Sequence, residues 1–213
     1  MEYSEEPMEF TLERKIKHYS NHHKILLVGE GDFSFSKCLA NAFGSASNIT
    51  ATSLDSQASL MCNYTDATAN IEELKLLGCT ILHEVDASIM LYDYRLNHTT
   101  FDRIVFNFPH CGIFQENNAS VIELHKGVVR GFLRNAIAML APNGQVHITH
   151  KIEEPYNRWG IMELAEQTGF CLLDISGFCP WEYAGYVNKR GAGSKCNESF
   201  PVGLSATFKF VKA

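Results

Sequence analysis

Short apolar runs alternate along the chain with longer segments in which apolar residues recur at helical spacing. Residues 24–28 form an apolar run after Lys24 without polar alternation, which is typical of a strand buried on both faces of a sheet. The longer segments carry apolar residues three or four positions apart, as on one face of an amphipathic helix. We predict strands at residues 24–28, 49–54, 80–85, 101–108, 146–149, 170–175 and 206–212, and helices at residues 35–42, 66–77, 120–140 and 159–167.

The order of these elements predicts an α/β fold. Strands that alternate with helices form parallel β-α-β units, and a series of such units builds a doubly wound, mostly parallel sheet. The last two strands have no helix between them, so we expect the C-terminal strand to run antiparallel at or near the sheet edge. Pro142-Asn143-Gly144 is expected to separate the long helix from the fifth strand.

No repeat, low-complexity stretch or Pro/Gly/Ser-rich linker divides the chain. We therefore expect a single Rossmann-like domain over residues 24–213, preceded by a polar, partly disordered lead-in over residues 1–23. The lead-in is unlike a secretory signal, and no apolar run approaches the roughly 20 residues of a membrane-spanning helix. These features predict an intracellular protein without a membrane segment, and we expect it to be a monomer.

Composition narrows the chemistry further. The 213 residues are 46% hydrophobic and 20% charged, as in ordinary globular proteins. The seven cysteines include no Cys-x-x-Cys pair, and no acid or cysteine completes the cluster of His18, His22 and His23, so we expect no metal site. The net charge of −6 disfavours broad, nonspecific nucleic-acid binding.

The loop Gly29-Glu30-Gly31-Asp32-Phe33-Ser34 follows the first strand, where a doubly wound fold binds its ligand. Its glycines let the backbone approach a ligand, and N–H groups at the start of the next helix attract a carboxylate or phosphate. Ser34 replaces the third glycine of the dinucleotide motif, while Glu30 and Asp32 suit an ammonium group. The methionine end of S-adenosylmethionine carries an ammonium and a carboxylate. We therefore predict a methyl-donor site; a plain capped turn is the alternative.

Two further acids follow the second and third strands. Asp55 can accept hydrogen bonds from both ribose hydroxyls of a nucleoside. Asp86 can accept one from the adenine amine, or it can cap the helical turn after it. Because acids follow three successive strands, we favour a role in binding the cofactor over a role in capping helices. A cofactor site of this kind also indicates the class I methyltransferase fold. The predicted cofactor-binding residues are Gly29, Glu30, Gly31, Asp32, Phe33, Ser34, Asp55, Asp86 and Asn107.

The fourth strand runs into Phe106-Asn107-Phe108-Pro109-His110, opposite the methyl donor in such a fold. This segment resembles the Asn/Asp-Pro-Pro-aromatic loop of methyltransferases that act on base nitrogens. Asn107 can hydrogen-bond a base edge, Pro109 stiffens the backbone, and Phe108 or His110 can stack on a flipped base. His110, mostly neutral at cell pH, could accept the imide proton of uracil N3. We predict that Asn107, Pro109 and His110 are catalytic.

Alternatives to these roles come from ordinary packing. A turn over an apolar stack would also explain the segment, and Phe106 and Phe108, two positions apart, are expected to share one face. Aromatic residues followed by cations near residues 181–195 are typical of an RNA groove, or of a flexible glycine-rich loop with ordinary surface charge. His150 is a further weak candidate. The predicted substrate contacts are Phe108, Lys189, Arg190 and Lys195.

Three segments together resemble one known family. They are Ile25-Leu26-Leu27-Val28-Gly29-Glu30-Gly31-Asp32-Phe33-Ser34-Phe35-Ser36, then Asp102 with Asn107-Phe108-Pro109-His110-x-Gly112, and Thr207-Phe208-Lys209-Phe210. The chain is similar to the 25S ribosomal RNA uridine-N3 methyltransferase-like family, especially to plant members, whose lead-in is like Lys17-His18-Tyr19-Ser20. The resemblance implies a Rossmann-like enzyme that uses S-adenosylmethionine to methylate N3 of a uridine in large-subunit rRNA, with residence in the nucleus and nucleolus.

Two other functions stay open at this point. One is a Rossmann-like module that binds the cofactor without turnover, and the other is a methyltransferase for a small molecule or a protein, which suits the acidic charge. The chain also lacks long basic extensions, so a protein partner that supplies RNA affinity is expected if rRNA is the substrate. Residence in the cytoplasm is the alternative to the nucleolus.

Overall fold

The computed structural model describes residues 12–213. Its strands are β1 (Lys15–Ile16), β2 (Tyr19–Ser20), β3 (Ile25–Val28), β4 (Ile49–Thr52), β5 (Thr80–Leu82), β6 (Phe101–Asn107), β7 (Leu140–Lys151), β8 (Phe170–Gly177) and β9 (Ser205–Lys212). Its α-helices are α1 (Ser34–Phe43), α2 (Gln57–Asn63), α3 (Ala67–Leu76), α4 (Ala119–Met139) and α5 (Ile161–Gln167). Short 3-10 turns lie at Met90–Tyr92, Tyr156–Trp159, Pro180–Glu182 and Gly193–Lys195.

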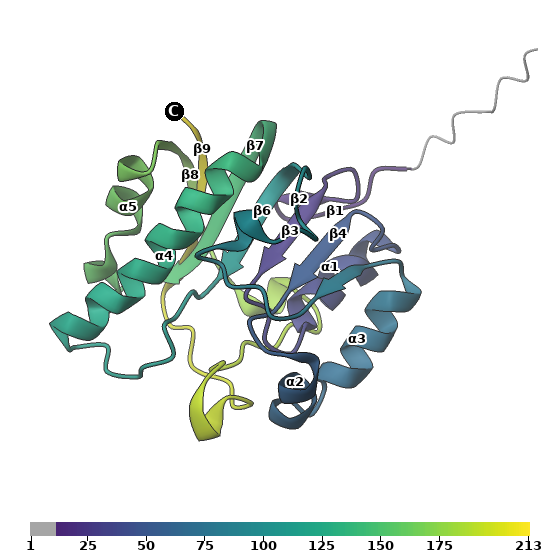
Figure 1. Cartoon of the computed structure of the whole chain (residues 1–213), viewed down its shortest axis with the longest axis horizontal. Coiled ribbons are helices and arrows are strands. Elements are labelled where there is room, and N and C mark those ends of the chain that lie inside the picture. The colour runs from purple at the N-terminus through teal and green to yellow at the C-terminus, as the bar shows by residue number, and fades with distance from the viewer. Residues whose placement is uncertain (1–11) are drawn as a thin grey trace, which may run out of the picture.

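Over the described residues, seven strands form one sheet in the order β5-β4-β3-β6-β7-β9-β8. Strand β9 is antiparallel to both of its neighbours, and the other neighbouring pairs are parallel. The C-terminal strand therefore lies second from the edge, inside β8 (Figure 1). This confirms the predicted class I methyltransferase architecture: a doubly wound, mostly parallel sheet with an antiparallel C-terminal strand.

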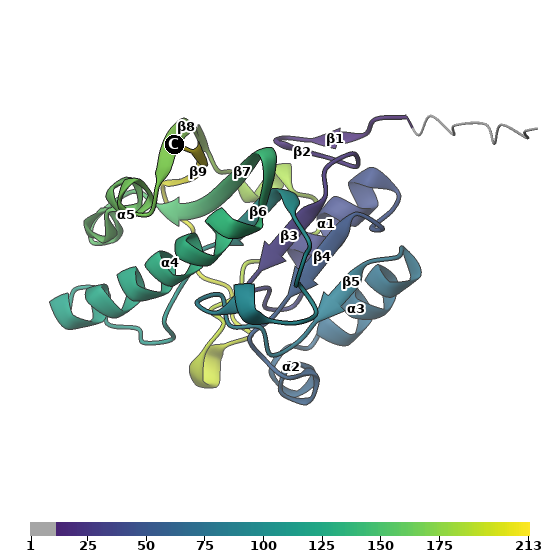
Figure 2. The same cartoon turned by 45° about the horizontal axis from the view of Figure 1, so that its top comes forward.

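Strand β3 shows how the sequence builds two cores. Because side chains alternate between the faces of a strand, Leu26 and Val28 join one apolar cluster while Ile25 and Leu27 join the other. Helices α4 and α5 cover the first cluster, and α1 and α3 cover the second. Figures 1 and 2 show α4 and α5 beside the β7–β9 half of the sheet, and α1 and α3 beside the β4–β5 half.

The chain reverses its winding direction between β3 and β6, which are hydrogen-bonded neighbours. In doubly wound sheets the crevice at this reversal, beyond the carboxyl ends of the strands, holds the ligand. The pairing sets Val28 opposite Phe106, so the next residues of the two strands, Gly29 and Asn107, enter the crevice side by side. Sheet register thus brings together the two loops that the sequence singles out.

Two of the differences between the predicted and the observed elements concern β7 and α2. The Pro142-Asn143-Gly144 turn lies inside β7, as an irregularity where the pairing shifts from Phe101–Leu140 to Arg103–Gln145. Helix α2 was not predicted, because Leu60 is its only buried residue and the segment has no apolar periodicity. Over the described residues, no helix is long and apolar enough to cross a membrane.

Residues 12–23, part of the predicted polar lead-in, pack against the sheet as a hairpin of β1 and β2. The ring of Tyr19 is 1% exposed, and its hydroxyl lies 3.2 Å from Nδ1 of buried His147 on β7. Tyr19 also meets the ring of Phe35 edge-to-face, and the Arg14 guanidinium donates to the Phe43 carbonyl. The rest of the predicted lead-in, residues 1–11, lies outside the described residues.

We expect Tyr19→Ala to lower the free energy of unfolding by about 3–5 kcal/mol, because it deletes a fully buried aromatic ring. Tyr19→Phe keeps the ring and removes the contact with His147, so its cost is expected near 1 kcal/mol. Urea denaturation of both variants measures this. A loss below about 1 kcal/mol for Tyr19→Ala would show that the hairpin does not stabilise the fold.

Candidate functional site

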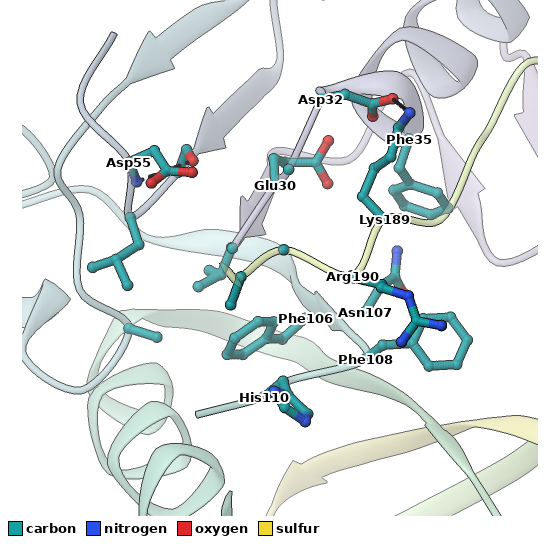
Figure 3. Close-up of a pocket in the computed structure, with 18 of the residues that line it drawn as sticks. Glu30, Asp32, Phe35, Asp55, Phe106, Asn107, Phe108, His110, Lys189 and Arg190 are labelled. Atoms are coloured by element: carbon teal, nitrogen blue, oxygen red, sulfur yellow. Dashed lines mark hydrogen bonds and ion pairs between the residues drawn. The ribbon is translucent and has the colours of Figure 1, made fainter. Parts of the chain in front are cut away.

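A cavity of about 470 Å³ lies at the carboxyl ends of β3, β4 and β6 (Figure 3). The loops after β3, β5 and β6 form its walls, and the segment 186–192 closes another side. Twelve of the predicted site residues line it: Gly29, Glu30, Gly31, Asp32, Ser34, Asp55, Asp86, Asn107, Phe108, His110, Lys189 and Arg190. The sequence therefore identified most of the polar residues around this cavity.

The turn after β3 requires glycine at its first position. Gly29 has φ +69°, and a Cβ there would lie 2.4 Å from Cε2 of the Phe106 ring. The positive φ and the nearby ring would each destabilise the fold if residue 29 carried a side chain. Gly31 faces the opposite wall, where an added Cβ would meet Cβ of Lys189 at 3.4 Å.

The two acids of this loop hold its own backbone. Glu30 accepts hydrogen bonds from both the backbone N–H and the hydroxyl of Ser36, at 3.1 and 2.6 Å. Asp32 accepts one from the Ser34 N–H at 3.0 Å. These bonds satisfy donors at the start of α1 that would otherwise lack partners. Burial raises the pKa of Glu30 to about 7, and the bonds from Ser36 act against that rise.

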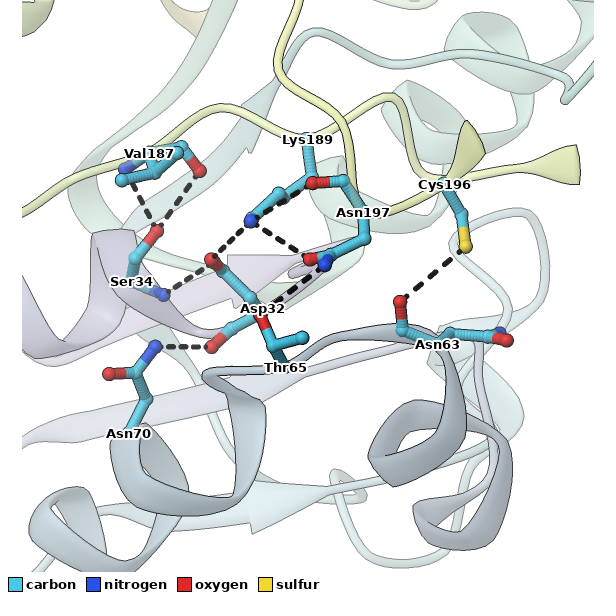
Figure 4. A network of polar contacts seen from close by, with 9 residues as sticks. All are labelled: Asp32, Ser34, Asn63, Thr65, Asn70, Val187, Lys189, Cys196 and Asn197. Atoms are coloured by element: carbon cyan, nitrogen blue, oxygen red, sulfur yellow. Dashed lines mark hydrogen bonds and ion pairs between the residues drawn. The ribbon is translucent and has the colours of Figure 1, made fainter. Parts of the chain in front are cut away.

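The other carboxylate oxygen of Asp32 faces a cation of the protein itself. Lys189 Nζ lies 3.6 Å from it and also donates to the carbonyl and the side-chain oxygen of Asn197 (Figure 4). Next to this pair, the Ser34 hydroxyl donates to the Val187 carbonyl and accepts from its N–H. The segment around Lys189 is thereby fastened to the loop after β3, although some 150 residues separate them.

Asp55 and Asp86 differ in their freedom to bind a ligand. Asp55 lines the cavity, and its carboxylate has no hydrogen bond or ion pair with any described residue; burial raises its pKa. Asp86 accepts the Ser88 N–H at 2.7 Å, so it caps the turn after it as well as lining the cavity. Asp55 is therefore the open acceptor on this wall.

Across the cavity, the end of β6 presents the amide of Asn107. Its Oδ1 is buried and has no hydrogen-bond partner among the described residues. Phe108 has φ +50°, which ends the strand and turns its ring away from that of Phe106. The two rings lie in different cores: Phe106 packs on Phe132, and Phe108 on Phe178. The expectation that they share one face is wrong, because the strand does not continue through Phe108.

A second cavity, of about 190 Å³, adjoins the first and shares Phe108, His110, Lys189, Arg190 and Phe200 with it. Pro109 lines this second cavity only. His110 stands between the two. Its Nδ1 accepts a hydrogen bond from the Gly112 N–H at 2.9 Å, and burial lowers its pKa to about 4. The neutral ring therefore carries its proton on Nε2.

Two predicted residues lie in neither cavity. Phe33 is fully buried with φ +61°, and its ring meets that of His83 edge-to-face beneath the loop. Lys195 is exposed in the turn Gly193–Lys195 and pairs with Glu198 at 3.7 Å. Residues that the sequence did not identify include Tyr64, which follows the unpredicted α2 and has no signal in its sequence surroundings. Gly191 and Ala192 also line the cavity; they lie within the stretch 181–195 that the sequence indicates, but they were not predicted individually.

The cavity fits a nucleoside cofactor with an amino-acid tail. Its volume lies in the range of about 300–1,000 Å³ usual for ligand sites. Asp55 offers an unpartnered carboxylate for ribose hydroxyls, while Leu54, Val85 and Ala87 form an apolar wall for a flat ring. The glycine turn and Lys189 lie at the far end, where a charged tail would reach. These residues would hold S-adenosylmethionine.

Comparison with known proteins places these features in a family. Residues 26–190 match the BMT5-like family, described as rRNA (uridine-N3-)-methyltransferase BTM5-like. An uncharacterised Arabidopsis thaliana protein is 52% identical, over 94% of this chain and 98% of its own length. The heavy metal-associated isoprenylated plant protein 41 of A. thaliana is 46% identical over 92% of this chain, which spans 38% of that protein. The Saccharomyces cerevisiae 25S rRNA (uridine(2634)-N(3))-methyltransferase is 24% identical over 83% of this chain and 68% of its own length.

Solved structures agree on the fold. A methyltransferase from Pyrococcus furiosus superposes with a TM-score of 0.54 at 16% identity, covering 88% of this chain and 74% of that one. The N-methyltransferase NodS from Bradyrhizobium japonicum, in complex with S-adenosyl-L-homocysteine, gives 0.51 at 14% identity, covering 88% and 76%. At these identities the likeness establishes the class I methyltransferase fold alone.

We expect Asp55→Ala to weaken S-adenosylmethionine binding about tenfold to a hundredfold, because it removes a charged acceptor for the ribose. Isothermal titration calorimetry measures the affinity. Asp66→Ala is the matched control, since Asp66 is exposed at the start of α3 and lies outside the cavity. An unchanged affinity in folded Asp55→Ala would place the ribose elsewhere.

Glu30 predicts a stability change with pH. Its pKa of about 7 in the folded protein lies above the ordinary value of 4.5, so the folded state binds its proton more tightly than the unfolded chain does. The stabilisation from that proton is complete below pH 4.5 and is lost as pH rises through 7.

Glu30→Gln mimics the protonated form at every pH. Its stability relative to the wild type is therefore expected to rise by about 3 kcal/mol between pH 4.5 and 8, at roughly 1.36 kcal/mol per pKa unit. Urea denaturation of both proteins at each pH gives this difference, in which the titration of the histidines cancels. A difference that does not change with pH would mean that Glu30 is not buried as described.

Proposed function

Because the chain belongs to the BMT5-like family, with a class I fold and S-adenosylmethionine as its cofactor, we propose that it methylates N3 of a uridine in large-subunit, 25S-like rRNA. When bound, the cofactor supplies an electrophilic methyl group. The observation that carries the proposal is the unpartnered Oδ1 of Asn107, placed beside Gly29 by the pairing of β3 with β6. A hydrogen-bond acceptor thus stands next to the donor loop.

Uracil N3 matches this acceptor, because its imide N–H is a hydrogen-bond donor. An amide oxygen that accepts this N–H holds the base edge beside the donor loop. The N3 proton has to leave before N3 takes the methyl group, and because an amide oxygen is too weak a base to keep it, that proton passes to water. A buried acceptor without a partner costs about 1–3 kcal/mol, and a base edge that pairs with Asn107 removes that cost. Pro109 follows Phe108 and restricts the backbone at this point. The side-chain amide of Asn107 and the ring of Phe108 therefore keep their positions relative to each other.

Cations beside the second cavity support a nucleic-acid substrate. Lys151, Lys189 and Arg190 line it, with Glu116 as the acid among them. Lys151 Nζ lies over the rings of Tyr156 and Phe200, at 4.6 and 5.2 Å. Aromatic rings and cations arranged in this way suit a stacked base and its phosphate.

The net charge of −6 opposes binding to a long RNA. We therefore propose that a protein partner supplies part of the RNA affinity. An rRNA substrate places the protein in the nucleus, including the nucleolus, or in the cytoplasm during late ribosome assembly.

The test is transfer of a labelled methyl group to total rRNA, followed by digestion to nucleosides. We expect label in 3-methyluridine. Asn107→Ala is expected to lower kcat/KM by about tenfold to a hundredfold, whereas Asn97→Ala, at an exposed turn outside both cavities, leaves it unchanged.

Other outcomes overturn the proposal in distinct ways. Label in a protein or small molecule and none in RNA would identify a different substrate, which the acidic charge favours. Cofactor binding with no transfer to any cellular extract would indicate a module without turnover.

A further inference from the structure

Aromatic rings wall the second cavity, among them Trp159, His110 and Phe114. Behind them, buried His125 lies parallel to the indole of Trp159, with centroids 4.2 Å apart and planes at 11°. The ring of His110 is tilted by 48° to His125 at 4.2 Å, and it stacks on Phe114 at 4.8 Å. At about 190 Å³, this cavity is smaller than the roughly 300–1,000 Å³ of sites for larger ligands. A single flat ring is the ligand that such a cavity suits.

The hydrogen-bonding direction of His110 is fixed by its neighbours. The Gly112 N–H occupies the lone pair of Nδ1, so Nε2 bears the proton of the neutral ring. Burial, and to a smaller extent the nearby His125 and His150, lower the pKa of His110 and so oppose a second proton. Nε2 is buried and has no partner among the described residues. His110 is therefore an unsatisfied donor rather than a free base.

His150 and Trp159, which also line the second cavity, have ring nitrogens whose role as donor or acceptor is fixed. His150 Nδ1 lies 2.7 Å from the Lys151 carbonyl oxygen, which can only accept, so Nδ1 is the donor and Nε2 of the neutral ring keeps its lone pair. The indole Nε1 of Trp159 is a second buried donor without a partner in the described chain. The cavity wall thus offers two N–H groups and one ring-nitrogen acceptor.

We propose that the second cavity binds the acceptor base, and that the Nε2–H of His110 selects uracil over cytosine by donating to the carbonyl oxygen O4. This inference rests on the proposed function for the identity of the reaction. Uracil presents O4 as an acceptor, whereas cytosine presents an amino group at the same position. With cytosine, two donors would meet in a buried site and both would lose a hydrogen bond, which a specificity pocket penalises strongly.

The role assigned here differs from that of a proton acceptor. A ring whose Nδ1 is occupied and whose Nε2 carries hydrogen has no lone pair free for a proton. To select uracil by donating a hydrogen bond, His110 must keep its proton on Nε2. The backbone N–H of Gly112 holds this tautomer, because it occupies the lone pair of Nδ1.

Binding of mononucleotides tests the pocket without turnover. The chain has two tryptophans, so Trp181→Phe, at an exposed position, leaves Trp159 as the single fluorescent reporter in the cavity wall. In this background, with S-adenosylhomocysteine bound, we expect uridine 5′-monophosphate to quench Trp159 saturably. Cytidine 5′-monophosphate is expected to bind about tenfold more weakly or worse.

His110→Phe keeps a ring in the stack and removes the donor. It is expected to weaken uridine monophosphate binding to the level of cytidine monophosphate, while an unchanged midpoint of urea denaturation shows that the protein remains folded. His110→Gln, whose amide can place an N–H near the position of Nε2, is expected to restore part of the preference. Equal binding of the two nucleotides by the wild type, no quenching by either, or a preference that survives in His110→Phe would each overturn the inference.

The outcome is separate from that of the proposed function. If the protein prefers uridine monophosphate through His110 but transfers no methyl group to rRNA, the base pocket is supported and the proposed reaction is wrong. If the protein forms 3-methyluridine but His110→Phe still prefers uridine monophosphate, the reaction is supported and the role of His110 is wrong.

Discussion

The contact between Gly29 and the Phe106 ring is the constraint on which the site depends. Parallel pairing of β3 with β6 sets Val28 opposite Phe106, and the chain then turns at Gly29 directly against that ring. A Cβ would lie 2.4 Å from the ring, and the φ of +69° is itself unfavourable for other residues. The loop after β3 continues past the sheet edge to α1, which begins at Ser34. The same pairing of β3 with β6 makes Asn107 and the donor loop neighbours.

The same loop accounts for the late segment of the chain. Once α1 begins at Ser34, the Ser34 hydroxyl faces Val187 and Asp32 faces Lys189. Asn197 holds the Lys189 ammonium from the other side. The hydrogen bonds of Ser34 and Lys189 are 2.9–3.1 Å long, and the ion pair between Lys189 and Asp32, at 3.6 Å, is mostly sheltered from water. In such surroundings, hydrogen bonds to charged groups contribute more than at a surface. The late segment is thus a wall of both cavities rather than an independent loop.

Much of this arrangement was predictable from the sequence, and the reasons are local. Seven strands and four helices follow from apolar periodicity, and the site between β3 and β6 follows from their order. What the sequence did not reveal depends on distant partners. The pairing of Lys189 with Asp32 joins residues some 150 positions apart, and Tyr19 packs on His147 across 128. The spacing of apolar residues along the chain does not indicate contacts between residues so far apart. The polar residues of mixed charge around Tyr19 likewise do not indicate that it is buried.

The acids of the donor loop show what residue types alone leave out. The residue types predict that Glu30 and Asp32 bind a ligand ammonium and that the N–H groups at the start of α1 bind its carboxylate. In the structure the two sets satisfy each other: Glu30 takes the Ser36 N–H and Asp32 takes the Ser34 N–H. The Lys189 ammonium at that end of the cavity is paired with Asp32 and Asn197, whereas the Asp55 carboxylate at the other end has no partner among the described residues. Asp55 is therefore the acid that stays open to ribose hydroxyls, which the sequence order of the acids does not reveal.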